Sequence, residues 1–215
     1  MKRGEVERVD TATQILDVAE RLVQVRGFNG FSYADVAAEL KITKATLHYH
    51  FAGKAELGDA LVARYATRFA EALTEVEART AEAPARLDAY ADLYLDVLRD
   101  QRMCLCGMMA AEYSTLPTSM QEGIVRFFDD NELWLARILE KGREEGALTF
   151  VGPPGETARM IISGLEGAML VTRLFSDIAR FQNAAAHLFS GLKSTPARSV
   201  RSRRGPKAVS AAGRG

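Results

Sequence analysis

Apolar residues recur every three or four positions along almost the whole chain up to residue 193, and the strict alternation typical of β-strands is scarcely visible. In the first periodic segment, over about residues 11 to 26, Ile15, Ala19, Leu22 and Val23 fall at helical spacing, and Gly27 follows the last turn. The pattern predicts an all-α protein.

Three short helical segments are followed by a long one. Ser32-Tyr33-Ala34-Asp35 has the order of a capping box, in which the serine hydroxyl bonds the amide three residues on and the acid reaches back. Thr43 is placed to cap the next short helix, which runs to about Phe51. Gly53 then separates it from a predicted long helix over about residues 54 to 79.

Prolines and glycines divide the rest of the chain into further predicted helices, at about 85 to 100, 104 to 115, 119 to 145, 154 to 175 and 177 to 193. We therefore predict a helical head at residues 1–55 and a body of about five to six helices at residues 56–193. The tail, residues 194–215, contains Pro, Gly, Ser, Arg and Ala without apolar periodicity, and it is predicted to be disordered.

Composition narrows the class of protein. The 215 residues are 47% hydrophobic, which is enough for a substantial core, and no apolar run has the length of a membrane span. The two cysteines lie one residue apart, a spacing that fits neither a disulfide framework nor a zinc site. We expect a cytoplasmic protein with no membrane partner, no metal and no cofactor.

A formal net charge of zero hides an uneven distribution. Residues 191 to 215 contain no acid and seven basic groups, so residues 1 to 190 have 21 basic against 28 acidic groups. The basic residues are Lys193, Arg198, Arg201, Arg203, Arg204, Lys207 and Arg214. The tail either neutralises DNA phosphates or is a solvated extension, and the second interpretation is favoured.

The head has the proportions of a helix-turn-helix unit: a helix of about eight residues, a short turn, and a second helix from Thr43 that can lie in the DNA major groove. Its predicted outward positions are polar or basic: Thr43, Lys44, Thr46, His48, Tyr49 and Lys54. From Arg21 to Lys54 there are five basic residues and two acids, so this part is locally positive.

The run FSYADVAAELKITKATLHYHFAGKAELGDALV resembles the N-terminal helix-turn-helix of TetR/AcrR-family transcriptional regulators, and the resemblance covers roughly residues 10 to 62. It departs from the family at His48, where tyrosine is more usual. The resemblance implies that Lys44 and His48 read base edges. It also implies phosphate contacts by Thr43, Tyr49 and Lys54, together with Ser32 and Tyr33 at the start of the preceding helix.

His48 and His50 first suggest a metal site. They are two residues apart and so point to different sides of a helix, whereas helical metal pairs use a spacing of three or four. We therefore do not predict a metal site, and His50 is open to interpretation as a packed, hydrogen-bonded histidine.

The family resemblance further implies a ligand-receiving body whose last two helices pair with a second copy. Apolar stripes suit such a pairing, and Gly164, Gly167 and Ala184 would permit close helix approach. The stripes contain Ile161, Ile162, Leu165, Ala168 and Met169, then Phe181, Ala184, Ala185, Leu188 and Phe189. Two heads about 34 to 36 Å apart in such a homodimer would read successive major grooves of a palindromic operator.

Thiols, thioethers and aromatics gather in the middle of the body, in QRMCLCGMMAAEYSTLP and the helix after it. They suit a small apolar or electrophilic effector, although the same residues are also ordinary core. The candidate effector residues are Cys104, Cys106, Met108, Met109, Tyr113, Phe127 and Trp134.

On a helix, Cys104 and Cys106 project about 200° apart, so they do not line one wall together. A position at the start of a helix beside Arg102 is expected to lower the pKa of one thiol. CLCG is similar to the cysteine-bearing segment of TetR-type repressors that sense electrophiles or unsaturated acids such as acrylate. The alternative is that both cysteines are inert and buried.

The leading hypothesis is a ligand-responsive, DNA-binding regulator, most simply a repressor, and not an enzyme. One alternative is an all-α thiol enzyme using Cys104 or Cys106 with His187 as base, but no Cys, His and carboxylate spacing supports it. The other is an architectural DNA binder without an effector, for which the body is larger than dimerisation requires.

Overall fold

The computed structural model describes residues 10–193, and this part of the chain is helical apart from turns and one isolated bridge between Leu148 and Lys193. The prediction of an all-α fold is confirmed. The helices of the described part are α1 (Thr11–Arg26), α2 (Tyr33–Leu40), α3 (Lys44–His50), α4 (Lys54–Arg79), α5 (Ala83–Arg99), α6 (Leu105–Ala110), the 3-10 helix η1 (Tyr113–Thr115), α7 (Thr118–Glu144), α8 (Pro154–Phe175) and α9 (Ile178–Ser190).

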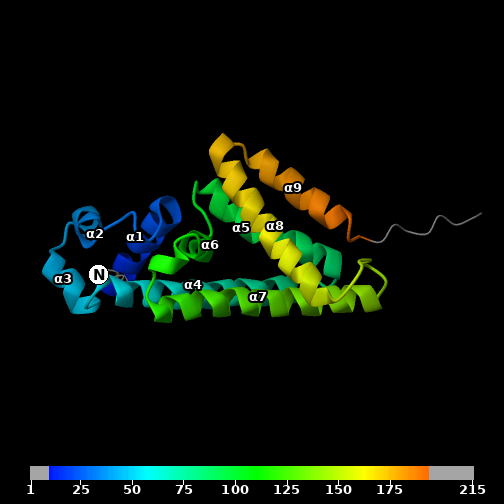
Figure 1. Cartoon of the computed structure of the whole chain (residues 1–215), viewed down its shortest axis with the longest axis horizontal. Coiled ribbons are helices and arrows are strands. Elements are labelled where there is room, and N and C mark those ends of the chain that lie inside the picture. The colour runs from blue at the N-terminus through cyan, green and yellow to red at the C-terminus, as the bar shows by residue number, and fades with distance from the viewer. Residues whose placement is uncertain (1–9, 194–215) are drawn as a thin grey trace, which may run out of the picture.

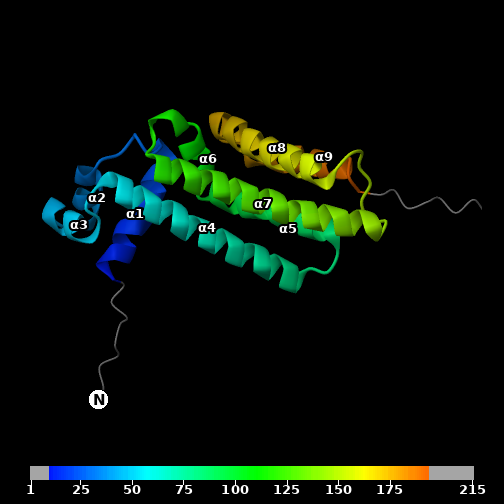
Figure 2. The same ribbon diagram turned by 60° about the horizontal axis from the view of Figure 1, so that its bottom comes forward.

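Helices α4 and α7 lie side by side along the long axis of the molecule (Figures 1 and 2). Helices α1 to α3 form the head at one end, while α8 and α9 pack as a pair over α5 and α7. The core of the body is built from large side chains such as Tyr90, Phe181 and Phe189, all almost fully buried. Helix α4 begins in the head and continues through the body, so it connects the two.

An ion-pair network fastens α1 to α4. The Glu20 carboxylate is buried and accepts from Arg64 at 2.7 Å and from Arg68 at 2.9 Å, and Arg64 also reaches Asp17 at 2.8 Å. A buried carboxylate is tolerated when charged donors satisfy its oxygens, as they do here. The network holds the head at a defined angle on the connecting helix.

The predicted helix over about residues 104 to 115 is wrong in its second half. Helix α6 ends at Ala110, and η1 follows after a turn in which the Thr115 amide donates to the Glu112 carbonyl at 2.9 Å. The side chains of Glu112 and Thr115 bond residues 28 and 29 of the head instead of solvent. These distant contacts, which helical periodicity does not encode, favour a break at this point.

The apolar stripes predicted for dimerisation mostly face inward. Seven of the ten predicted residues are buried in the core of the subunit. Six of these have large side chains, namely Ile161, Ile162, Leu165, Met169, Phe181 and Phe189, and the seventh is Ala185. The outward face of α8 is formed instead by Met160, Leu170, Val171 and Leu174, with Gly164 and Gly167 between them. The small residues were therefore placed correctly on the outer face and the large ones were not.

No helix between residues 10 and 193 combines the length and apolarity needed to cross a membrane. The predictions for the basic tail, residues 194–215, lie outside the described residues.

Candidate nucleic-acid interface and buried thiol cluster

Helices α2 and α3 form the helix-turn-helix. Lys41 adopts a left-handed conformation (φ 55°) after α2, and the Thr43 hydroxyl caps α3 by accepting from the Thr46 amide at 3.1 Å. Leu47 is completely buried and Phe51 nearly so, which seats α3 against the rest of the head. A helix of seven residues needs such tertiary packing because it is too short to be stable alone.

The outer side of α3 presents several of the predicted DNA-contacting residues together. Thr43, Lys44 and His48 are exposed, and Tyr49 is 85% exposed. Thr46 is half-buried, with its hydroxyl 3.0 Å from that of Thr43. So exposed a tyrosine is unusual for a helix with no contact to make, and its hydroxyl, like the Lys44 ammonium, suits phosphate and base edges.

His48 and Tyr33 also have internal partners. The His48 Nδ1 lies 3.0 Å from the Ala52 carbonyl oxygen, and its ring centroid is 4.9 Å from that of Tyr33. The Tyr33 hydroxyl donates to the Phe51 carbonyl at 3.1 Å, and burial raises its pKa. The Ser32 amide and hydroxyl both donate to Asp35, at 2.7 and 2.6 Å. These bonds set the position of the α2 N-terminus relative to α3.

Lys54 has a role that its sequence motif did not reveal. Its ammonium donates to the carbonyls of Phe28 and Phe31 and lies 4.6 and 4.3 Å from their ring centroids. Burial lowers its pKa. The side chain therefore braces the α1–α2 loop, and its assignment as a phosphate anchor stays a prediction.

His50 is half-buried with its ring centroid 5.1 Å from that of Tyr49. No group of three His, Cys, Asp or Glu side chains within residues 10–193 is arranged to hold a metal ion.

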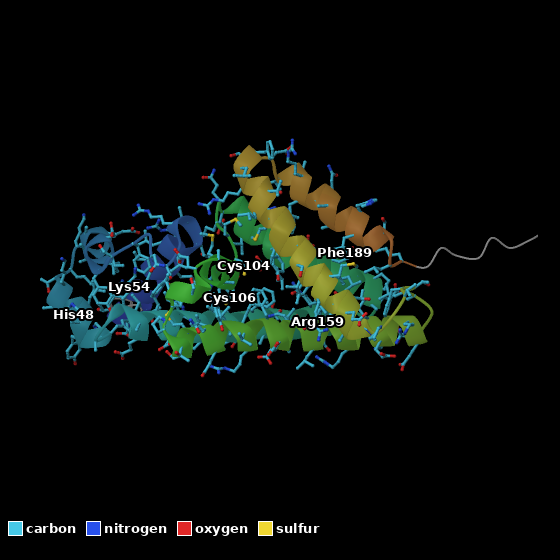
Figure 3. The ribbon with its side chains drawn as sticks, viewed as in Figure 1. His48, Lys54, Cys104, Cys106, Arg159 and Phe189 are labelled. Carbon is cyan, nitrogen blue, oxygen red and sulfur yellow. The ribbon has the colours of Figure 1, made fainter. Side chains whose placement is uncertain are left out.

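Both cysteines are buried, Cys104 at the N-terminus of α6 and Cys106 within it, and both lie well away from His48 (Figure 3). Cys104 is the N-cap of α6: its Sγ accepts from the Gly107 amide at 3.4 Å, and its own amide donates to the Met169 sulfur at 3.4 Å. Tyr65 from α4 and Glu166 from α8 face the same thiol. We call Tyr65, Cys104, Cys106 and Glu166 the thiol cluster.

The expectation of a lowered thiol pKa is wrong. Burial, with a further contribution from Glu166, raises the pKa of both Cys104 and Cys106. Burial also raises the pKa of Glu166 to about 7, and its Oε1 has no hydrogen-bond partner. A six-residue helix supplies too small a dipole to offset this loss of hydration.

Gly107 allows the carboxylate to reach the thiols. A methyl group at position 107 would overlap the Glu166 carboxylate in its present position, so the carboxylate would have to move away. Sequence periodicity did not identify Glu166 or Tyr65, because nothing in the local pattern separates these polar positions from the exposed face of a helix.

Of the other predicted effector residues, Met108 and Met109 lie on α6 with Cys106, whereas Phe127 and Trp134 lie on α7. Phe127 and Trp134 line a groove of about 310 Å³ between α4 and α7, together with Phe69, Glu77 and Asn131. Trp134 Nε1 donates to Glu77 at 2.6 Å. Met109 is buried, Met108 is half-buried, and Tyr113 is 42% exposed. The Phe127 ring contacts that of Tyr65 in the thiol cluster, with centroids 5.5 Å apart, so the predicted set extends from the thiols to this groove.

The tyrosines Tyr90 and Tyr94 lie in the core between the thiols and the α4–α7 groove. The Tyr90 and Tyr94 hydroxyls are 3.1 Å apart, and Tyr90 also reaches the Asn131 Oδ1 at 3.5 Å. The Tyr90 ring stacks on Trp134, with centroids 5.6 Å apart. Two tyrosines four residues apart on a helix lie on the same side of it. This spacing is the one sequence signal that could have predicted that their hydroxyls meet.

The segment that carries the cysteines also holds the head. The Glu112 carboxylate accepts from the Phe28 amide at 2.6 Å and from the Asn29 amide at 3.2 Å. Asn29 Nδ2 donates to Thr115 at 2.8 Å, and the Met103 amide donates to the Gln24 carbonyl at 3.2 Å. Residues on both sides of α6 thus touch the end of α1.

A helix-turn-helix head with an exposed basic and aromatic recognition helix, joined to a helical body, defines a DNA-binding regulator. The model for "Bacterial regulatory proteins, tetR family" matches residues 15–61, and that for "Tetracyclin repressor-like, C-terminal domain" matches residues 83–188. The chain belongs to the TetR family of transcriptional regulators.

Relatives span most of the chain. The transcriptional repressor NemR of Escherichia coli is 26% identical over 87% of this chain and 96% of its own length. The crystal structure of its reduced form covers 88% of this chain and all of NemR, with a TM-score of 0.76 and 27% identity. A TetR regulator from Legionella pneumophila is 30% identical, covers 87% of this chain and all of its own, and has a TM-score of 0.79.

The family is one of non-enzymatic transcriptional regulators, which confirms the predicted function and excludes the thiol-enzyme hypothesis. His187, its proposed base, lies on the exposed side of α9, whereas both cysteines are buried.

Proposed function

We propose that this repressor acts as a homodimer on a palindromic operator and is released when a small apolar or electrophilic molecule reaches the thiol cluster. The observation that carries the proposal is the position of α6. Cys104 caps its first turn, and Glu112, two residues past its end, bonds the α1–α2 loop of the head. A change at the cluster therefore has a short path to the DNA-binding unit.

We propose separate roles for the head and the body of the chain. Residues 1–55 bind DNA, with Lys44, His48, Tyr49, Thr43 and Thr46 toward the groove. Residues 56–193 receive the effector and dimerise. The exposed apolar face of α8 supports dimerisation, because Leu170, Val171 and Leu174 would be costly to leave in water and Gly164 and Gly167 permit close helix approach.

The dimer has two states: in one the spacing of the heads matches successive major grooves, and in the other it does not. Release from the operator is a shift of the population toward the second state. A reversal from 99:1 to 1:99 requires the effector to discriminate the two states by about 5.5 kcal/mol. A covalent adduct on a buried thiol could supply this, because Cys104 is only 2% exposed and an adduct there would displace the side chains packed around it. The α6 segment would have to move, and Glu112 would move with it.

Replacing Lys44 by alanine is expected to weaken operator binding by about 1 to 3 kcal/mol, roughly 5- to 150-fold, because base-edge and phosphate donors contribute on this scale. Fluorescence anisotropy with labelled operator DNA measures the loss. Lys141→Ala is the matched control, since Lys141 is an exposed lysine on α7, away from the head. Equal affinity of both variants and wild type would remove Lys44 from the interface.

Alkylation by N-ethylmaleimide is expected to be slow, since both thiols are buried with raised pKa, and to abolish operator binding once complete. Mass spectrometry gives the extent of modification, and anisotropy gives DNA affinity on the same samples. The variants Cys104→Ala and Cys106→Ala, singly and combined, identify the responsible thiol. Full alkylation with unchanged affinity would refute the sensor role.

A further inference from the structure

A second concave site lies away from the thiol cluster, where the C-terminal ends of α5 and α8 meet the start of α9. Its volume is about 370 Å³. It is lined by three arginines, Arg99, Arg102 and Arg173, and by Thr172 and Asp177 among others. We call it the arginine pocket. No residue of the thiol cluster or the α4–α7 groove lines it.

Two of the three guanidiniums lack an acidic partner. Arg99 pairs with Asp96 at 2.8 Å, whereas the side chain of Arg102 has no ion pair or hydrogen bond with any residue in the range 10–193. Arg173 donates to the Val25 carbonyl and lies 3.6 Å from the Met108 sulfur, but bonds no carboxylate of the described part of the chain.

The one acid of the pocket is already engaged. Asp177 accepts from the Ala179 amide at 3.1 Å and pairs with Arg180 at 3.6 Å. The pocket therefore has an excess of positive charge that its own side chains do not compensate.

Thr172 provides an independent observation. It is only 3% exposed, and its hydroxyl has no hydrogen-bond partner among the described residues. A buried hydroxyl without a partner costs about 1 to 3 kcal/mol, so native proteins rarely leave one unexplained. Because solvent does not reach this oxygen, an anion in the pocket satisfies it only when the Thr172 side chain rotates, and an anion is also the ligand that arginines favour.

We propose that the arginine pocket binds a small anion bearing a carboxylate or phosphate group. The planar guanidiniums of Arg102 and Arg173 offer paired N–H donors that match the oxygens of such groups. The volume suits a small molecule rather than a macromolecular segment.

The pocket is linked to the head through Arg173. This side chain lines the pocket and also donates to Val25 in the last turn of α1, next to the loop that Glu112 holds. An anion that draws the guanidinium inward weakens the Val25 contact. Anion binding and DNA binding are therefore coupled, and the coupling is reciprocal.

Titration with inorganic phosphate, followed by calorimetry on the full chain at constant ionic strength, tests the site. Saturable binding is expected for wild type, with a loss of tenfold or more in Arg102→Gln and in Arg173→Gln. Arg102→Lys should keep part of the affinity, since lysine keeps the positive charge but lacks the planar pair of N–H donors. Arg126→Gln, on the exposed side of α7 and paired with Glu122, is the matched control. Unsaturable binding, or equal affinity in all variants, overturns the proposal.

A second measurement distinguishes a free anion from the DNA backbone as the source of the phosphate. If a free anion is the ligand, phosphate changes operator affinity in wild type but not in Arg173→Gln. If a DNA phosphate occupies the pocket, operator DNA displaces inorganic phosphate competitively, and Arg102→Gln weakens DNA binding without added phosphate. Direct phosphate binding by the Cys104→Ala/Cys106→Ala variant keeps this test independent of the proposed sensor role.

Discussion

Replacing Glu166 by glutamine is expected to raise the free energy of unfolding by about 2 to 3 kcal/mol at pH 8 and to leave it nearly unchanged at pH 4. Burial raises the pKa of this carboxyl from the ordinary 4.5 to about 7. Below pH 4.5 the carboxyl is protonated in both the folded and the unfolded protein, so it carries no charge penalty in either state.

Between pH 4.5 and about 7, the Glu166 carboxyl keeps its proton in the folded protein but has already released it in the unfolded protein. The free energy of unfolding therefore falls as pH rises from about 4.5 to 7, and the loss is complete above 7. Glutamine resembles the neutral carboxyl and has no such loss. The stabilisation of the variant should accordingly appear within this window and reach its full size above it.

Urea denaturation of wild type and Glu166→Gln at a series of pH values measures the difference directly. Glu122→Gln is the matched control, because Glu122 is an exposed acid on α7. The explanation fails if the difference between Glu166→Gln and wild type is the same at pH 4 and pH 8. A wild-type protein that keeps this destabilising acid beside two thiols is consistent with a functional site rather than a structural one.

Replacing Leu47 by alanine is expected to lower the stability of the head by about 2 to 5 kcal/mol and to abolish operator binding at 25 °C. Leu47 is completely buried and is the sole buried residue of α3. Its removal leaves a cavity under the recognition helix, which is too short to persist without that packing.

Circular dichroism during thermal unfolding, read beside DNA anisotropy, tests this expectation. Leu133→Ala is the control, since Leu133 is 65% exposed and its truncation should change stability by less than about 0.5 kcal/mol. Normal operator affinity in Leu47→Ala would show that α3 is held by other contacts, such as the Thr43 cap and the Tyr33 bond to Phe51.

Lys54 and Glu112 show what local pattern omits. The motif around Lys54 predicts a phosphate contact, yet its ammonium braces the carbonyls of Phe28 and Phe31. Glu112 reads as a polar position within a predicted helix, yet its carboxylate bonds amides 83 and 84 residues earlier. The partners in both cases come from other elements, and helical periodicity contains no information about which elements meet.

The sequence by itself determined the all-α class, most helix boundaries and the helix-turn-helix head, because these depend on local periodicity, caps and turn residues. It also indicated that the segment from Cys104 to Cys106 was chemically unusual. Only the tertiary structure decided that both thiols are buried beside Glu166, that Phe127 and Trp134 line a groove between α4 and α7, and that the outer face of α8 is formed by Met160, Leu170, Val171 and Leu174. The physical reason is that burial and pKa depend on side chains that lie far apart along the chain and meet only when the helices pack.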